Sequence, residues 1–317
     1  MMFDPEKFSK EAIELIKQQI SDGKAIIACS GGVDSVVATV LVSRAIGDRL
    51  LAVHVDTGFM RKNESADVVK MMGRMNINHK FVDASKDFYA ALKGVTEPEK
   101  KRKIIGEKFI RVFEKEAKSI GAKYLVQGTI APDWIESGGE LRDVIKSHHN
   151  VGALPEKMDM KLVEPLRDLY KDEVRKLGRH LGIELAERQP FPGPGLAIRI
   201  IGEANEESAH IVREACAIVE EEFEKGAKAG KMELPWQYFA VLTPIKTVGV
   251  HGDVRAYGYT VAVRAVQSLD GMSAAYSKIP HEVLEKISIR ITNTMKDKVN
   301  RVVYDITNKP PATIEWE

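Results

Sequence analysis

The chain has 317 residues, of which 44% are hydrophobic and 29% are charged. This length favours about two domains, each large enough to bury its own core, and the composition is that of a soluble globular protein rather than a disordered chain. No apolar run approaches the roughly 18 residues needed to cross a bilayer. Lys and Arg number 47 against 46 Asp and Glu, so the overall charge predicts neither a nucleic-acid partner nor a membrane partner.

The N-terminal segment and the cysteines indicate a cytoplasmic protein. Residues 1–7 lack the basic segment and the apolar stretch of a secretory signal. Cys29 and Cys216 are too few to suggest a disulfide framework. We therefore expect a reducing, cytoplasmic environment.

The first part of the chain alternates between amphipathic helices and short apolar strands. The expected helices span residues 4–19, 33–45, 66–75, 105–120 and 172–181, and the expected strands span 25–29, 50–55, 79–82 and 124–128. Such alternation predicts a parallel sheet that is covered by helices on both faces. The expected fold class is therefore α/β for this part.

Two interruptions divide the pattern. Residues 129–162 lose all periodicity and are too long for a passive connector, so we expect a functional loop there. The Pro-Gly cluster of residues 190–195 fits neither a helix nor a central strand, and it predicts a boundary between domains of residues 1–188 and 189–317. In the second domain, helical patterns at 204–228 and 280–295 and strand patterns at 238–242, 260–266 and 301–305 predict a smaller α+β domain.

The loop from Ser30 to Ser35, Ser-Gly-Gly-Val-Asp-Ser, is the strongest chemical motif of the first domain. A glycine-rich turn from a strand into a helix directs backbone N–H groups and the positive end of the helix dipole at one point, where a phosphate can bind. Asp34 supplies an oxygen ligand suited to Mg²⁺. The loop lacks the Gly-Lys-[Ser/Thr] ending of a Walker loop. The plainer alternative is that Ser30 only caps a helix.

The wording of this loop resembles the pyrophosphate loop of the N-type ATP pyrophosphatases, enzymes that split ATP into AMP and pyrophosphate. The loop alone names no acceptor, because NAD synthetases, asparagine and argininosuccinate synthetases, tRNA-thiolating enzymes and GMP synthetases all carry versions of it. Further segments resemble GMP synthetases, and together they extend the resemblance from about residue 20 to the last residue. These segments are residues 101–106, 145–152, 191–196, 248–253 and 309–317.

The resemblance to GMP synthetases implies an ATP- and Mg²⁺-dependent ligase. The C2 oxygen of xanthosine monophosphate (XMP) attacks the α-phosphorus of ATP, pyrophosphate leaves, and ammonia displaces AMP to give GMP. Many GMP synthetases begin with a glutaminase domain, whereas this chain starts at the synthetase part and resembles the separate ATP pyrophosphatase subunit found in archaea. The resemblance therefore implies a glutaminase partner and a homodimer formed through the second domain.

The resemblance also implies site residues, which we group by role. The expected catalytic residues are Asp34 and five residues of a lid that spans 129–162, namely Asp133, Glu136, Lys146, His148 and His149. The expected ATP-binding residues are Cys29, Ser30, Gly31, Gly32, Val33, Asp34, Ser35, Val55, Gly58, Gly128 and Thr129, with Asp34 as metal ligand. The expected XMP-binding residues are Arg102, Gln237, Arg264, Lys309, Thr313, Ile314 and Glu315.

Alternatives remain for these residues and for the reaction. The lid residues could be solvated loop positions, Gln237 and Arg264 could be ordinary surface residues, and Gly58 and Gly128 could be plain turns. Another pyrophosphatase, such as an NAD synthetase or a tRNA thiolase, would have a different acceptor, although a tRNA enzyme would be expected to show a basic surface or zinc-binding cysteines. A nucleotide sensor could bind ATP in the same loop without cleaving it.

Overall fold

The computed structural model describes residues 3–132, 160–184, 189–251, 254–269 and 271–317. The chain divides into two compact units. The first unit consists of Met1–Thr57, Asn63–Ala84 and Gly106–Glu187, and the second of Gly58–Lys62, Ser85–Ile105 and Arg188–Glu317. This division differs from two consecutive domains, because residues 58–62 and 85–105 belong to the second unit.

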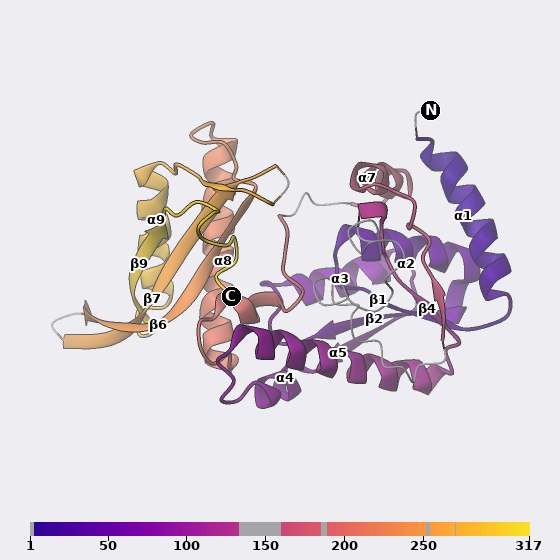
Figure 1. Ribbon diagram of the computed structural model, residues 1–317, viewed down its shortest axis with the longest axis horizontal. Helices are drawn as coiled ribbons and strands as arrows, with labels where there is room; N and C mark the ends of the chain where they lie inside the picture. Colours follow the sequence, from indigo (N-terminus) through magenta and orange to yellow (C-terminus); the bar gives the residue numbers. More distant parts are fainter. Residues whose placement is uncertain (1–2, 133–159, 185–188, 252–253, 270) are drawn as a thin grey trace. The chain divides into compact units, whose positions relative to one another are not determined.

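A parallel sheet forms the centre of the first unit (Figure 1). Its strand order is β3-β2-β1-β4-β5, and every neighbouring pair is parallel. The strands are β1 (Ala25–Ala28), β2 (Leu50–Asp56), β3 (His79–Asp83), β4 (Tyr124–Val126) and β5 (Lys161–Val163). The predicted parallel α/β sheet is therefore confirmed.

Helices cover both faces of this sheet. Figure 1 shows α5 on the opposite side of the sheet from α1, α2 and α7. The helices and short turns of this half of the chain are α1 (Pro5–Ile20), α2 (Val33–Ile46), η1 (Gly47–Arg49), α3 (Glu64–Arg74), α4 (Ser85–Ala91), α5 (Pro98–Ile120) and α7 (Lys171–His180). The Asp4 carboxylate begins α1, because it accepts hydrogen bonds from the backbone N–H groups of Glu6 and Lys7.

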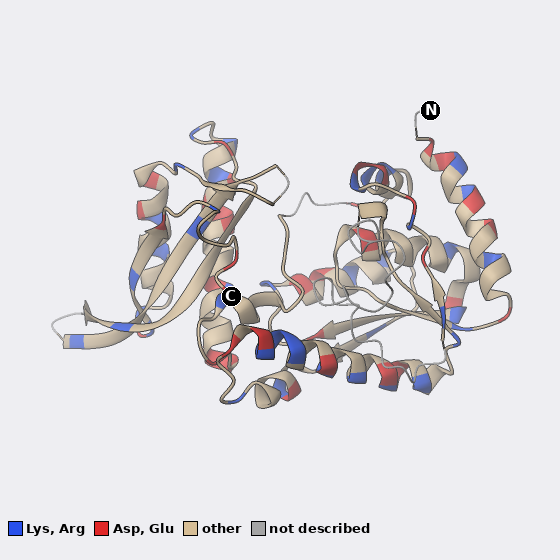
Figure 2. Cartoon of the chain, in the orientation of Figure 1, with Lys and Arg blue, Asp and Glu red and all other residues tan. Residues whose placement is uncertain are grey.

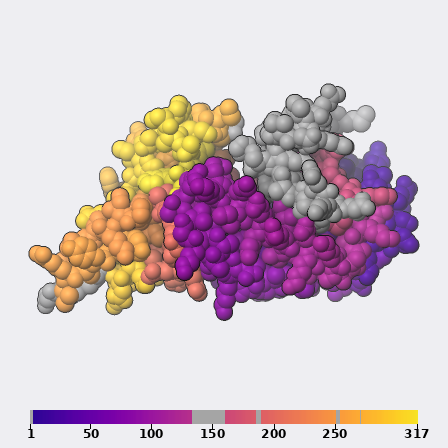
Figure 3. Space-filling view, turned by 60° about the horizontal axis from the view of Figure 1, so that its bottom comes forward, coloured from indigo at the N-terminus to yellow at the C-terminus, as the bar shows by residue number. Residues whose placement is uncertain are grey.

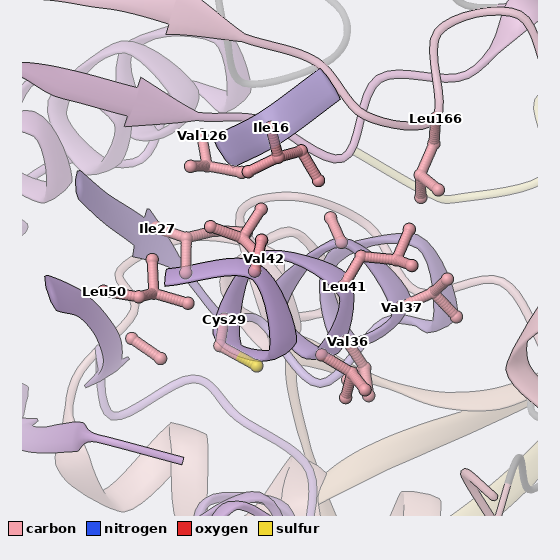
Figure 4. Packing of buried hydrophobic residues seen from close by; sticks show 14 of the residues in the cluster. Ile16, Ile27, Cys29, Val36, Val37, Leu41, Val42, Leu50, Val126 and Leu166 are labelled. Carbon is pink, nitrogen blue, oxygen red and sulfur yellow. The ribbon is translucent and has the colours of Figure 1, made fainter. Parts of the chain in front are cut away.

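The core of the first unit surrounds α2. Figure 4 shows Val37, Leu41 and Val42 of this helix packed among Ile27 of β1 and residues of other elements. Ile16 from α1 and Leu166 from the segment before α7 belong to the same cluster. Because α2 is buried around most of its circumference, the loop that begins this helix is held by a rigid support.

The second unit contains a mixed sheet packed against two helices. Strand β7 is central: it pairs antiparallel with β6 and β8 and parallel with β9. The elements are η2 (Gly195–Arg199), α8 (Glu206–Lys228), β6 (Gln237–His251), β7 (Val254–Gln267), β8 (Ala275–Tyr276), α9 (His281–Thr294) and β9 (Val299–Asp305). The predicted α+β architecture is thus confirmed for this part.

The sequence pattern underestimated or missed several elements. Strands β6 and β7 continue into a long hairpin, in which Val250, Val254 and Tyr257 are exposed and therefore show no burial pattern. Helix α4 and strand β5 were not predicted, since one is short and the other ends a segment without periodicity. None of the helices in the described part of the chain combines the length and the apolar character that crossing a membrane requires.

Replacing Leu41 of α2 with alanine tests the core of the first unit. Leu41 is fully buried, so the substitution should lower the free energy of unfolding by about 2–5 kcal/mol through lost burial and the cavity that remains. The measurement is urea denaturation followed by circular dichroism. The matched control is Leu15→Ala in α1, where the leucine is 54% exposed and the expected change is within about 0.5 kcal/mol. Equal losses in both variants would contradict this description of the core.

Candidate nucleotide-binding sites

The Ser30–Ser35 loop lies at the point where the order of the sheet reverses. Strands β2 and β3 extend from β1 in one direction, and β4 and β5 extend in the other. The loop follows the carboxyl end of β1, and Gly128 and Thr129 follow the carboxyl end of β4, its neighbour. In open α/β sheets, ligands bind at the carboxyl ends of the strands at this reversal.

Short hydrogen bonds fix the shape of the loop. The Ser35 hydroxyl donates to the carbonyl oxygen of Gly32 at 2.9 Å and lies 3.1 Å from the Ser30 hydroxyl. Gly31 has a φ of +85°, and a Cβ there would lie 2.7 Å from Cγ2 of Val68, so the position requires glycine. Ser30 and Gly32 are exposed, so the turn is open to a ligand at the start of α2.

Gly128 lies directly against the loop. A Cβ at this position would lie 2.9 Å from the carbonyl carbon of Asp34 and 3.0 Å from the backbone nitrogen of Ser35. Both contacts are with backbone, which cannot rotate away as the end of a side chain can. The close approach therefore sets where the first turn of α2 stands relative to the end of β4.

Asp34 and Lys171 form the charged part of this site. The Asp34 side chain is 26% exposed, and its Oδ2 lies 3.9 Å from Nζ of Lys171, the first residue of α7. Mg²⁺ in nucleotide sites is usually held by one or two carboxylates together with phosphate oxygens, so a single aspartate in this loop fits the ion. No group of three or more metal-ligating His, Cys, Asp or Glu side chains exists among the residues that the structure describes.

A buried polar chain supports the loop from below. His54 of β2 donates from Nδ1 to the carbonyl oxygen of Cys29 at 2.7 Å, and its Nε2 lies 3.0 Å from the Ser65 hydroxyl. Ser65 in turn donates to Oδ2 of Asp56 at 2.7 Å. The Cys29 side chain is buried and burial raises the pKa of its thiol, so an expected role at ATP falls to the backbone. The chain of contacts couples the end of β2 to the start of the loop.

The remaining expected ATP residues are less clearly part of this site. Val55 is buried in β2 and Thr129 is half-buried after β4. Gly58 belongs to the second unit, where its carbonyl oxygen accepts a hydrogen bond of 2.8 Å from the Tyr89 hydroxyl. The neighbouring Phe59 ring is fully buried edge-on against Tyr89, so an adenine cannot stack on it in this arrangement. The expected lid residues Asp133, Glu136, Lys146, His148 and His149 lie outside the described residues.

The seven expected XMP residues all belong to the second unit. Glu315 in the C-terminal tail is the best defined of them. Its Oε1 accepts a hydrogen bond of 2.9 Å from the Gln237 side chain, and both of its carboxylate oxygens are bound by the guanidinium of Arg199. In Figure 3 the C-terminal residues, yellow, form a continuous area of the surface.

Arg264 of β7 binds the backbone of the tail. It is fully buried, its Nε donates to the carbonyl oxygen of Ile314 and its Nη2 to that of Thr313, both at 2.8 Å. Its Nη1 donates to Asp305 at 2.7 Å. The observed contacts of Arg264 therefore shape the tail, and its expected role as an XMP contact stays a prediction.

Lys309 and Arg102 are held at the two ends of the same region. Lys309 is half-buried, donates from Nζ to the carbonyl oxygen of Gly271 at 2.8 Å and pairs through its backbone with Ala274. Arg102 of α5 donates to the carbonyl oxygen of Glu317 at 2.6 Å. Both cations therefore lie against the tail, where a phosphate could be bound.

Sequence reasoning missed several charged residues that the structure brings to these sites. Lys171 lies beside Asp34, whereas Arg199, Lys101 and Glu317 join in the second unit. Lys101 is fully buried and contacts both the Glu317 carboxylate and the carbonyl oxygen of Ile200. Burial lowers the pKa of Lys101, although the Glu317 carboxylate opposes that shift. Only the resemblance of residues 101–106 and 191–196 drew attention to these stretches.

Figure 2 shows why charge patterning gave no signal for these residues. Positive and negative side chains alternate along α1 and α5, and neither helix carries one sign alone. The buried cations of the second unit belong to the same near-neutral sequence. Their partners lie far away along the chain, 216 residues away for Lys101 and 116 for Arg199.

The fold and the loop define a protein with an ATP pyrophosphatase-like parallel sheet followed by a GMP synthase C-terminal domain. Among known families, the GMP synthase C terminal domain matches residues 224–316, and the queuosine biosynthesis protein QueC matches residues 24–189. The QueC match ends at residue 189 and so concerns the sheet of the first unit but not the tail.

Relatives that match the whole chain decide between these families. A separate subunit of GMP synthase [glutamine-hydrolyzing] from Pyrococcus furiosus is 60% identical over 98% of this chain and 97% of its own length. The corresponding subunit from Thermococcus kodakarensis is also 60% identical, over 98% of this chain and 99% of its own. The chain belongs to this family of GMP synthase [glutamine-hydrolyzing] subunits.

A longer relative shows which part of GMP synthase the chain represents. GMP synthase [glutamine-hydrolyzing] of Clostridium tetani is 56% identical over 98% of this chain but over only 61% of its own length. The family resemblance inferred from the sequence is therefore confirmed. The individual site residues remain predictions.

Replacing Gly128 with alanine tests the close approach to the loop. The new Cβ would force Asp34 and Ser35 to move, and a displacement of the phosphate site should lower the rate of ATP cleavage by about 100-fold. The measurement is pyrophosphate release at saturating ATP. The matched control is Gly73→Ala in α3, where no atom lies within 4 Å of the added Cβ and activity should be retained. A fully active Gly128→Ala protein would contradict the proposed contact.

Proposed function

We propose that this chain carries out the synthetase reaction of GMP formation. ATP adenylates the C2 oxygen of XMP with release of pyrophosphate, and ammonia then displaces AMP. The observation that carries the proposal is the 60% identity to a GMP synthase subunit over 98% of the chain. The loop at the sheet reversal supports the first half of the reaction, and the tail of the second unit supports recognition of the purine nucleotide.

In the ATP half of the reaction, the loop binds the pyrophosphate that leaves. The open backbone N–H groups of Gly31 and Gly32 and the start of α2 offer hydrogen bonds and a positive dipole end to phosphate oxygens. Lys171 adds a positive charge beside Asp34. Negative charge grows on the leaving group during adenylation, so these groups stabilise the transition state more than the bound substrate. Lys146, His148 and His149 are further proposed donors in the same role.

Asp34 is the residue proposed to hold Mg²⁺. When bound, the ion would neutralise phosphate charge between the nucleotide and the loop. Its carboxylate stands at the first turn of α2, where the adjacent loop residues can reach the same phosphate. Lys171 at 3.9 Å keeps this carboxylate in a positive environment before the ion binds.

In the XMP half of the reaction, the tail recognises the nucleotide. Glu315 and Gln237 carry oxygens and an amide suited to the base or ribose edges, and Lys309 and Arg102 carry charges suited to the phosphate. Thr313 and Ile314 complete the proposed contacts through the segment that Arg264 fixes. No covalent attachment to the protein is needed, because the substrate oxygen is itself the nucleophile.

The proposal includes two protein partners. The relatives that match over their whole length are named as one subunit of a glutamine-hydrolyzing enzyme, which accords with a separate glutaminase subunit that supplies ammonia. We also propose a homodimer formed through the second unit and a cytoplasmic location, as the resemblance of the sequence implies.

Ammonium ions should replace the glutaminase partner in an assay of the isolated chain. With ATP, Mg²⁺, XMP and ammonium chloride, GMP, AMP and pyrophosphate should form in equal amounts. With glutamine in place of ammonium, GMP should appear only after a glutaminase subunit is added. The products are separated by anion-exchange chromatography. ATP cleavage that does not depend on XMP would argue for a different acceptor.

Replacing Asp34 with alanine should lower XMP-dependent pyrophosphate release by at least about 1,000-fold, because the ion and the leaving group lose their carboxylate support. Circular dichroism should show that the fold is retained, since Asp34 is part of an exposed turn and not of the core. Asp48→Ala is the matched control, because Asp48 is exposed in η1. Near-normal turnover of the Asp34 variant would remove Asp34 from the mechanism.

A further inference from the structure

Arg199 makes the strongest polar contact with the tail, and the proposed mechanism has not yet used it. It is the last residue of η2 and is fully buried. Its Nε donates to Oε2 of Glu315 at 3.1 Å, and its Nη2 donates to Oε1 at 2.8 Å. This is the two-pronged geometry in which a planar guanidinium fixes a carboxylate in direction as well as in position.

Two aromatic rings determine the plane of this guanidinium. The Arg199 guanidinium carbon lies 4.1 Å from the centre of the Phe239 ring and 5.3 Å from that of Phe191. Phe191 also lies beneath the guanidinium of Arg61, at 4.3 Å. Such stacking attracts the cation and leaves its edge as the part that can form hydrogen bonds. The edge faces Glu315.

The Pro-Gly cluster places η2 and therefore Arg199. Gly195 has a φ of +65°, and a Cβ there would lie 2.4 Å from the carbonyl oxygen of Phe59. Leu196 donates its backbone N–H to that same oxygen at 2.8 Å. A side chain at position 195 would break this contact and shift the short helix that ends in Arg199. The cluster thus has a purpose beyond separating two parts of the chain.

The pair stays charged inside the protein. Burial works against the charge of Arg199, but the Glu315 carboxylate outweighs it and raises the pKa of the guanidinium. An ionised carboxylate can only accept hydrogen bonds. With Arg199 and Gln237 on Glu315, the lone pairs that remain are directed at N–H or O–H donors of a ligand.

We infer that Arg199 is a positioning residue for the purine nucleotide, which holds the Glu315 carboxylate in the orientation that accepts hydrogen bonds from XMP. The inference rests on the proposed function, in which Glu315 contacts XMP. It assigns recognition to the buried pair and not to Glu315 alone. It also explains why a tail segment, which is normally frayed, can take part in specificity.

The test is Arg199→Lys in the full chain, assayed with ATP, XMP and ammonium chloride. Lysine keeps the positive charge but loses the paired hydrogen bonds, so the KM for XMP should rise about 10- to 100-fold. The KM for ATP and kcat should change by less than about 3-fold, because the lost contact is made equally before and during the reaction. A purely structural role would instead alter all three parameters together with the melting temperature.

Two further variants complete the design. In the double variant R199K/E315Q, the KM for XMP should equal that of E315Q alone, because Arg199 acts only through Glu315. The matched control is Arg290→Lys, since Arg290 also donates from two nitrogens, to Glu221 and Glu222, but contacts no part of the tail in the described structure. Its KM values should match those of the wild type.

Distinct results separate this inference from the proposed function. If the wild type shows no XMP-dependent pyrophosphate release, the proposed function fails. If the wild type is active and a folded R199K protein has an unchanged KM for XMP, or if the effects of R199K and E315Q simply add, the inference is overturned. If R199K does not fold, Phe191→Leu decides: it removes one stacking ring and should raise the KM for XMP about 3-fold, and an unchanged value overturns the inference.

Discussion

Buried cations hold the C-terminal tail, and the architecture of the second unit depends on them. Arg199, Arg264 and Lys101 are each fully buried, and each binds the tail through a carboxylate or through backbone carbonyl oxygens. Charge withdrawn from water is costly, and removing one partner of such a pair typically costs about 3–5 kcal/mol. The tail therefore cannot leave its place without exposing several unpaired charges at once. A segment that would otherwise be mobile gains the rigidity of a core element.

The two candidate sites solve the problem of binding a nucleotide in different ways. The loop of the first unit uses backbone: glycines permit close approach, and α2 is fixed by a hydrophobic core around it. The tail of the second unit uses side chains, whose positions are fixed by other side chains behind them. A phosphate is well served by backbone N–H groups, which every residue other than proline supplies. A purine base must be told apart from others, and that requires side-chain groups of defined direction.

The sequence predicted the first unit better than the second. The strand before Ser30, the helix after it and the alternation that follows all show in local periodicity, so the parallel sheet and the site at its reversal could be predicted. Gly128 was expected only as a strand end, since its contact with Asp34 joins residues far apart in the chain. Arg199 and Lys101 look like surface residues in sequence, because burial of a charge depends on a partner that periodicity does not reveal. The tail itself was predicted from family resemblance, and no local pattern would have led to it.

The division of the chain has a consequence for protein engineering. The second unit takes in residues 58–62 and 85–105 besides everything from residue 188 onward, so it is assembled from three pieces of sequence. A chain cut near residue 188 would part Glu317 from Lys101 and Arg102, and it would part Arg213 from the carbonyl oxygens of Gly58 and Met60. The two halves are therefore poor candidates for separate expression, exchange between relatives or insertion of a foreign domain at that point. They are better treated as one inseparable object of design.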